Sequence, residues 1–250
     1  MQMVRFAPLY EQRGLITATA RYDTPGATQR VPLIFRMGNL GGHQHILVIR
    51  DVAGENLEDS AADSTVFGFF GHADGVFFLF DPMRLEEIRH MLAGVVPEQR
   101  AVGGDPYAVL HNLVRLMRGG NQLIRTPLAV ILAKFDTLYE LRNVTGARWA
   151  PMLRNAGAAY SRDPSLSSPA YDADDAELLD AEVSSLLTRL DAGQLLHLIA
   201  NEFETARMFA VSALGASPSG QLLHPCGIAP FRCLDPLKWI LSRTVPIRVG

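Results

Sequence analysis

Cysteine is scarce in this chain, and its placement matches no familiar motif. The 250 residues include two cysteines, Cys226 and Cys233, separated by six residues. This spacing is typical of neither a zinc site nor a redox-active pair. We therefore expect buried or free thiols rather than a metal or redox centre.

Long apolar runs and basic runs are absent as well. The apolar stretches at 76–80 and 128–133 are far too short to cross a bilayer. The N-terminal residues 1–14 include charged residues, where a signal peptide needs an apolar segment. The formal net charge of −3 gives no global electrostatic reason to bind nucleic acid or an acidic membrane surface. These absences predict a cytoplasmic protein without nucleic-acid or membrane partners.

The composition is otherwise that of a globular protein, and its patterns alternate between strand and helix. With 48% hydrophobic and 20% charged residues, the chain can bury a sizeable core. Alternating strands and helices predict an α/β fold, with a doubly wound, mostly parallel sheet and helices on both faces. Strands are expected at 31–36, 45–50, 75–80, 126–133 and 208–211, and helices at 83–93, 106–117, 137–142, 176–190, 193–204 and 235–242.

The domain organisation follows from the same patterns. Residues 1–250 read as a single domain, in which a glycine-containing turn joins the first two strands into a hairpin that adds one antiparallel strand to the sheet. Residues 146–205 read as an insertion with a loop and two helices. The loop, 146–174, is rich in Ala, Ser, Pro and Asp, so we expect it to be exposed and mobile.

Three strand-to-loop junctions stand out as candidate ligand-binding positions. The apolar run 46–49 reads as a buried parallel strand and is followed by DVAGE with Asp51, while AKFD ends at Asp136 and SALG begins at Ser212. Ligands of open α/β sheets bind outside the carboxyl ends of the strands. A carboxylate there can hold a hydrated Mg²⁺ ion, and Gly54 lets its N–H approach a phosphate.

Taken in this order, the three junctions resemble the motifs of the Ras-like P-loop GTPase superfamily. The resemblance covers residues 31–242. The long insertion, the DVAGE sequence and the final LDPLKWIL helix are most similar to bacterial double-GTPase domains of signalling or conflict systems. The resemblance implies a guanine-nucleotide switch that binds GTP or GDP with Mg²⁺ and has protein partners in a multidomain signalling system.

The resemblance also implies roles for single residues around the phosphates. Asp51 would hold Mg²⁺ through water, and Thr19 would close over the ion, although Thr17, Thr24 and Thr28 are also available. The Gly54 N–H would sense the terminal phosphate, and Glu55 stands where the family commonly orients water with Gln. Because ionised Glu only accepts hydrogen bonds, we expect slow hydrolysis.

Further roles concern the guanine base. Asp136 would accept its two N–H donors, the Lys134 stem would lie along it, Ser212 would brace the loop, and the Ala213 N–H would face its carbonyl oxygen. Each residue also has an ordinary alternative: helix cap for Asp136, solvated strand end for Lys134, and turn residues for the other two. Ala133 replaces the usual Asn of the family, which puts guanine preference in doubt.

The largest departure from the family is a missing phosphate loop. The chain contains no GxxxxGK followed by Ser or Thr, the motif that cradles the β and γ phosphates. One hypothesis is therefore a fragment or shortened form of a longer GTPase, which hydrolyses GTP only if this loop comes from upstream or from another chain. The alternative is a degenerate GTPase-like scaffold that binds proteins and no nucleotide.

Overall fold

Three parallel strands form the centre of the protein. The computed structural model describes residues 32–40, 42–58, 67–96, 105–120, 122–146, 150–168, 170–218 and 222–244. The sheet has the order β3 Val76–Phe80, β4 Leu128–Leu132 and β5 Ala206–Ala210. Its strands are parallel, and each pair keeps one continuous register along all five residues. The α/β class and the three apolar runs predicted as parallel strands are therefore confirmed.

The middle strand, β4, is buried along its entire length. All five residues of its LAVIL sequence are buried, as expected for a parallel strand that is covered on both faces. Each of the predicted helices has a counterpart. Further elements are α4 Glu86–Leu92, α6 Phe135–Tyr139, α7 Ala150–Leu153, α8 Ala173–Arg189 and 3₁₀ turns at Gly68–His72, Pro82–Arg84, Glu140–Asn143, Ala159–Ser161 and Pro164–Leu166.

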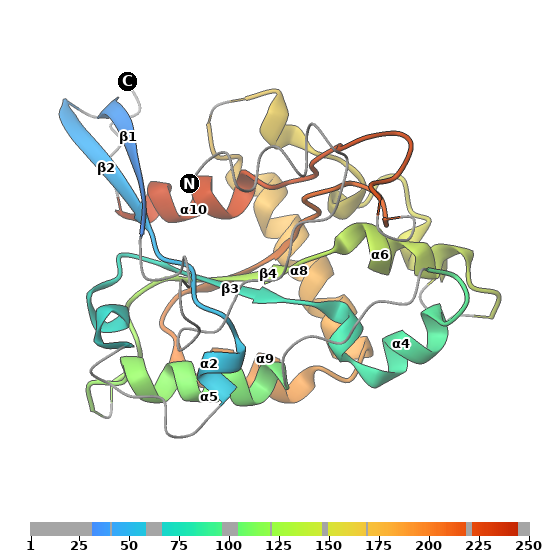
Figure 1. The fold of residues 1–250 in the computed structure, drawn as a ribbon, viewed down its shortest axis with the longest axis horizontal. Coiled ribbons are helices and arrows are strands. Elements are labelled where there is room, and N and C mark those ends of the chain that lie inside the picture. The colour runs from blue at the N-terminus through green and yellow to red at the C-terminus, as the bar shows by residue number, and fades with distance from the viewer. Residues whose placement is uncertain are drawn as a thin grey trace.

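Helices cover both faces of the central sheet (Figure 1). Helix α10, Asp235–Thr244, lies over one face, and α5 Pro106–Met117 and α9 Gly193–Glu202 lie on the other side. The Trp239 ring of α10 contacts Phe209 of β5, with 5.7 Å between ring centroids. Helix α10 also approaches Gly75 so closely that an added Cβ would lie 2.7 Å from Ile240 Cγ2, so a larger residue at this position would force the Ile240 side chain to move.

The first two strands form a separate hairpin. β1 Leu33–Leu40 and β2 His43–Ile49 pair antiparallel, and within the described residues neither is hydrogen-bonded to the central sheet. The predictions of a buried parallel strand at 46–49 and of an antiparallel member of the main sheet are therefore wrong. The hairpin is tied to the core by side chains instead: the Arg50 guanidinium lies 4.1 Å from the Phe69 ring centroid.

The segment 146–174 was expected to be exposed, and this prediction is wrong for much of its length. Leu153 and Tyr160 are fully buried, and Ser165 is buried as well. The Tyr160 hydroxyl donates to the carbonyl of Met152, and its backbone N–H donates to Glu182 of α8 at 3.2 Å. Polar composition suggested a surface loop, whereas its few apolar side chains fill the space beside α8.

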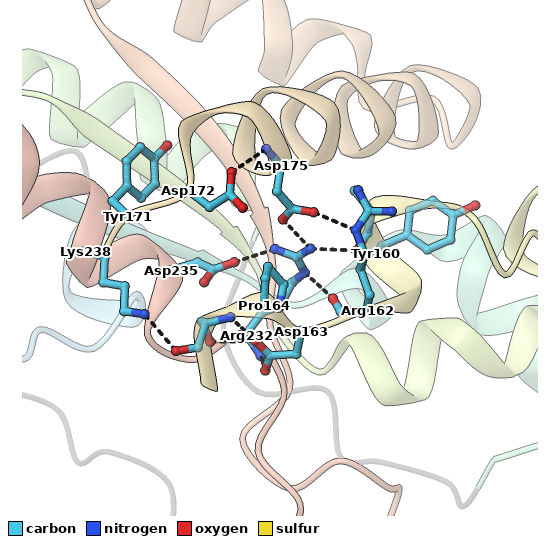
Figure 2. A network of polar contacts seen from close by, with 12 residues as sticks. Tyr160, Arg162, Asp163, Pro164, Tyr171, Asp172, Asp175, Arg232, Asp235 and Lys238 are labelled. Atoms are coloured by element: carbon cyan, nitrogen blue, oxygen red, sulfur yellow. Dashed lines mark hydrogen bonds and ion pairs between the residues drawn. The ribbon is translucent and has the colours of Figure 1, made fainter. Parts of the chain in front are cut away.

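A buried arginine holds this segment to the end of the chain (Figure 2). Arg232 has no exposed surface. Its Nη2 donates to Asp175 at 2.6 Å and to the carbonyl of Ala159 at 2.7 Å, and its Nη1 donates to Asp235 at 2.5 Å. Its Nε donates to the carbonyl of Arg162 at 2.8 Å. The guanidinium thus joins a loop, the start of α8 and the start of α10.

The backbone around Arg232 is part of the same arrangement. Arg232 adopts a left-handed conformation with φ of 51°, which costs a non-glycine residue about 1 kcal/mol or more. Its N–H donates to Asp163 at 2.6 Å, and Lys238 donates to the carbonyls of Ser165 and Ser168. These bonds offset the strain. Burial raises the pKa of Asp235, and the Arg232 guanidinium opposes that rise.

We expect removal of the buried guanidinium to destabilise the protein strongly. Arg232→Met leaves the buried carboxylate of Asp235 without its cation and leaves Asp175 with the Arg162 guanidinium alone, a change that costs about 3–5 kcal/mol. Urea denaturation measures the free energy of unfolding. Arg125→Met removes an exposed arginine 3.9 Å from Glu204 and should change stability by about 0.5 kcal/mol or less. Equal stability of the two variants would refute the role of Arg232.

An aspartate protects the outer side of β5. Asp180 of α8 accepts a hydrogen bond from the Met208 backbone N–H at 2.6 Å. Burial raises the pKa of Asp180, while this N–H and the nearby Arg207 partly oppose the rise. The carboxylate therefore satisfies a strand-edge donor at the cost of partial desolvation of its charge.

This pKa shift predicts how the stability of the protein depends on pH. Because the folded state holds its proton to higher pH than the unfolded state, the contribution of Asp180 is fully present below about pH 4 and is lost as pH rises through the folded pKa. Asp180→Asn keeps an oxygen for Met208 without a charge. We expect its stability relative to wild type to improve from acidic to neutral pH in urea denaturation.

Asp180→Ala is the control, because it removes the acceptor as well as the charge. It should be destabilised by about 1–3 kcal/mol through the unpaired Met208 N–H. A stability difference between Asp180→Asn and wild type that stays constant with pH would contradict the assignment.

Candidate functional site

Polar residues follow all three strands at the carboxyl edge of the central sheet. Asp81 comes after β3, Lys134 and Asp136 after β4, and Ser212 after β5. Backbone hydrogen bonds continue beyond the strands: the Ala133 N–H donates to the Phe80 carbonyl at 2.8 Å, and the Phe135 N–H donates to the Val211 carbonyl at 3.1 Å. The loops after the strands are thus joined to one another, and we call this region the carboxyl rim.

Lys134 is turned toward the neighbouring strand end. Its backbone is left-handed, with φ of 51°, and its Nζ lies 2.8 Å from Oδ2 of Asp81. Asp81 in addition accepts a hydrogen bond from the Met83 N–H at 2.9 Å and so begins the turn at Pro82–Arg84. Lys134 is exposed, which agrees with the sequence-based alternative of a solvated strand end, and it also forms an ion pair across the rim.

Ser212 is buried, and its hydroxyl forms hydrogen bonds with two other residues. Its hydroxyl donates to Oδ1 of Asp136 at 2.5 Å and accepts a hydrogen bond from the Gly215 N–H at 2.8 Å. Only 1% of Ser212 is exposed. Its backbone pairs in both directions with Phe231, the residue before Arg232, so the arginine network also positions this loop.

The structure therefore brings together some of the residues singled out in the sequence. Asp136 and Ser212 are in direct contact, Lys134 pairs with Asp81, and Ala213 is exposed in the loop next to Ser212. The bracing contact of Ser212 is a property of the folded chain. The roles of Lys134, Asp136, Ser212 and Ala213 in binding a guanine base stay predictions.

The proposed phosphate and magnesium residues lie on another segment. Asp51 is exposed, Gly54 lies in the turn that opens helix α2 Glu55–Glu58, and Glu55 is the first residue of that helix. Helix α2 is held against α5, where Asn112 donates to the carbonyl of Leu57 at 2.7 Å (Figure 1). Thr19 lies outside the described residues. The metal and catalytic roles of these residues stay predictions.

The described residues offer little for metal chemistry. Within them, no three His, Cys, Asp or Glu side chains gather where they could hold a metal ion. Cys226 and Cys233 are free, exposed thiols; of the two expectations from the sequence, buried or free thiols, the structure shows the second. In the same parts of the chain, no helix combines the length and the apolarity that a membrane crossing requires.

The hairpin carries an exposed apolar surface that sequence reasoning missed. Ile34 and Ile46 are each 64% exposed, and Val48 is 56% exposed. Ile34 lies opposite Val48 and Arg36 lies opposite Ile46, so these four side chains share one face of the two strands. We call it the outer hairpin face; the opposite face of β2, with Leu47 and Ile49, is half-buried against the molecule.

A signal for this surface was present in the sequence but had been assigned another meaning. The continuous apolar run 46–49 was taken as a strand covered on both sides, although the glycine-rich turn before it already indicated a two-stranded hairpin. A hairpin of two strands cannot bury both faces without a further layer. The exposed face is the larger departure from ordinary surface composition, because the polar groups of the carboxyl rim are paired with one another.

Neither a family model nor a solved structure matches this chain. Among curated proteins, it is similar to the "Putative ESX-1 scaffolding and assembly protein SaeC" of Mycolicibacterium smegmatis (strain ATCC 700084 / mc(2)155). The two are 46% identical over 239 residues, which cover 94% of this chain and 61% of the relative. The chain thus spans less than two thirds of the relative's length.

This relative overturns the main functional prediction from the sequence. A guanine-nucleotide switch was expected from three short junction motifs, whereas the similar protein is named for scaffolding and assembly. Two of the three motifs also serve an ordinary structural purpose, as the contacts of Lys134 and Ser212 show. The chain is therefore similar, over nearly its whole length, to a protein named for scaffolding, and the alternative prediction of an interaction scaffold fits better than the GTPase.

Proposed function

We propose that this chain is a protein-interaction scaffold that takes part in ESX-1 assembly through the outer hairpin face. The observation that carries the proposal is the group of three large aliphatic side chains, Ile34, Ile46 and Val48, which are mostly exposed on one face. The scaffolding name of the similar protein supports the same function. The GTPase-like origin of the framework is part of the proposal and rests on the order of the three junctions.

Burial of this face by a partner is energetically favourable. Full burial of an isoleucine or valine side chain contributes about 1.5–3 kcal/mol, so covering three that are more than half exposed is worth about 1 kcal/mol each. Contiguous apolar surface of this kind on a soluble domain is typical of interaction sites. The hairpin also stands out from the body of the protein, where a partner can reach it (Figure 1).

The carboxyl rim has little left to offer a nucleotide. The Ser212 hydroxyl is engaged by Asp136 and Gly215, and the Lys134 ammonium lies 2.8 Å from Asp81. A base or phosphate would have to displace these contacts. No phosphate-loop motif in the chain compensates for that cost. We infer that the rim stabilises the loops around it and does not hold GTP.

Site-specific cross-linking in living cells tests the scaffold surface. A photo-reactive residue in place of Ile46 in the natural full-length protein should capture a protein partner, because the outer hairpin face would be covered in the assembly. The same residue in place of Leu178, which is 55% exposed on α8, is the matched control. Equal yields of cross-linked product at the two positions would place the interaction surface elsewhere.

Thermal unfolding in the presence of nucleotide tests the other half of the proposal. Because a ligand that binds only the folded state raises the melting temperature, we expect no shift when GTP and Mg²⁺ are added to the full chain. Asp136→Asn, which would weaken guanine recognition, should respond in the same way as wild type. A GTP-dependent rise that this substitution abolishes would contradict the proposal.

A further inference from the structure

We propose that the β1–β2 hairpin binds its partner by strand addition, and that the partner contributes an extended segment with alternating aliphatic side chains and a carboxylate. This inference rests on the proposed scaffold function and names the chemistry of the segment that the scaffold holds. Three features of the hairpin carry it: the edges of its strands, the composition of its outer face and its charge.

The first feature is the open edge of the small sheet. Within the parts of the chain that the structure describes, β1 and β2 pair with each other and with no third strand. The outward N–H and C=O groups of such strands are a template for another strand. The edge of β5 is treated differently, because Asp180 accepts a hydrogen bond from Met208 there at 2.6 Å.

The second feature is the alternation of exposed aliphatic side chains on the hairpin. Ile46 and Val48 are two residues apart on β2, and Ile34 lies across from Val48. An added strand in register places every second side chain on this same face. Beside β2, its aliphatic residues would pair directly with Ile46 and Val48 and would extend the row that continues to Ile34 on β1.

The third feature is a positive charge with no acidic residue in the hairpin. Residues 32–50 contain Arg36 and Arg50 but no aspartate or glutamate. Arg50 lies over the Phe69 ring, whereas Arg36 is exposed on the outer face opposite Ile46. A carboxylate on the added strand, level with Arg36, would complement this charge.

The same charge argues against a second copy of this chain as the occupant. Two hairpins paired edge to edge would bring their Arg36 side chains onto one surface, and neither hairpin has a carboxylate to neutralise them. The irregular register between Arg36 and Gly38 further restricts regular pairing to the stretch near Ile34 and Val48. We therefore assign the site to a different protein with an acidic, aliphatic strand.

Peptide binding to the full chain tests the proposal directly. The probe is a fluorescent synthetic peptide that alternates valine with threonine and carries one glutamate on the valine face; its twin has lysine in that position. Fluorescence anisotropy should show that the glutamate peptide binds the wild-type protein. The affinity of the lysine peptide should be lower by a factor of at least about five. Arg36→Glu should reverse this preference.

Two further measurements separate strand addition from other modes of binding. A glutamate peptide N-methylated at alternate residues keeps its side chains but cannot donate along one edge. Methylation in the phase that faces the hairpin should abolish binding, and methylation in the other phase should leave binding largely intact. Ile46→Thr keeps strand propensity and should weaken binding about fivefold, while Leu178→Gln on α8 should leave it unchanged. Circular dichroism verifies that each variant is folded.

Several results would overturn the inference. These are equal binding of the glutamate and lysine peptides, full binding of both methylated peptides, or absence of binding to wild type. Sedimentation of the chain as a dimer that Ile46→Thr dissociates would assign the face to a second copy instead. If the peptides fail while cross-linking at position 46 captures a partner in cells, strand addition is wrong and the scaffold function stands.

Discussion

The buried guanidinium of Arg232 is the interaction on which the C-terminal half of the structure depends. It joins carboxylates from the start of α8 and the start of α10 to backbone carbonyls of the segment around Ala159. A buried ion pair of this kind adds little net stability relative to an apolar core, but it is strongly destabilising when one partner is removed. Its value lies in fixing which segments meet, because the groups that accept its hydrogen bonds come from three separate segments of the chain.

This constraint extends to the loops at the carboxyl rim. Phe231, next to Arg232, pairs with Ser212, whose hydroxyl holds Asp136, and Lys134 connects the loop after β4 to Asp81. The loops that resemble nucleotide-binding motifs are thus held by contacts with one another. A site whose polar groups are satisfied internally stabilises a framework, and the rim of this protein has that character.

The hairpin presents the opposite situation. Its backbone edges are open within the described residues, and Ile34, Ile46 and Val48 are exposed although such side chains are usually buried. The central sheet has a charged residue, Asp180, over the outer strand β5. A scaffold needs a rigid body and a surface that gains free energy when covered. Under the function proposed above, the helix-covered sheet is the rigid body and the hairpin is that surface.

Much of the fold was predictable because it depends on near neighbours in the sequence. The apolar runs that became β3, β4 and β5 specify buried parallel strands, and Asp105 followed by Pro106 is a strong start for α5, where the carboxylate accepts from the Tyr107 N–H at 3.0 Å. The candidate site was less predictable. Asp136 and Ser212 were singled out correctly as neighbours, but the sequence alone assigned them to a ligand.

The sequence by itself determined the α/β class, the parallel strands and the approximate positions of most helices, since periodicity and capping act over a few residues. Only the tertiary structure decided that the hairpin stands apart from the main sheet and that Arg232 lies at the centre of a network. The partners of Arg232 are 57 and 73 residues away at Asp175 and Ala159, and Ser212 meets Asp136 over a separation of 76 residues. Contacts at such separations leave no periodic trace in the sequence, because they arise when packed elements bring distant polar groups out of water together.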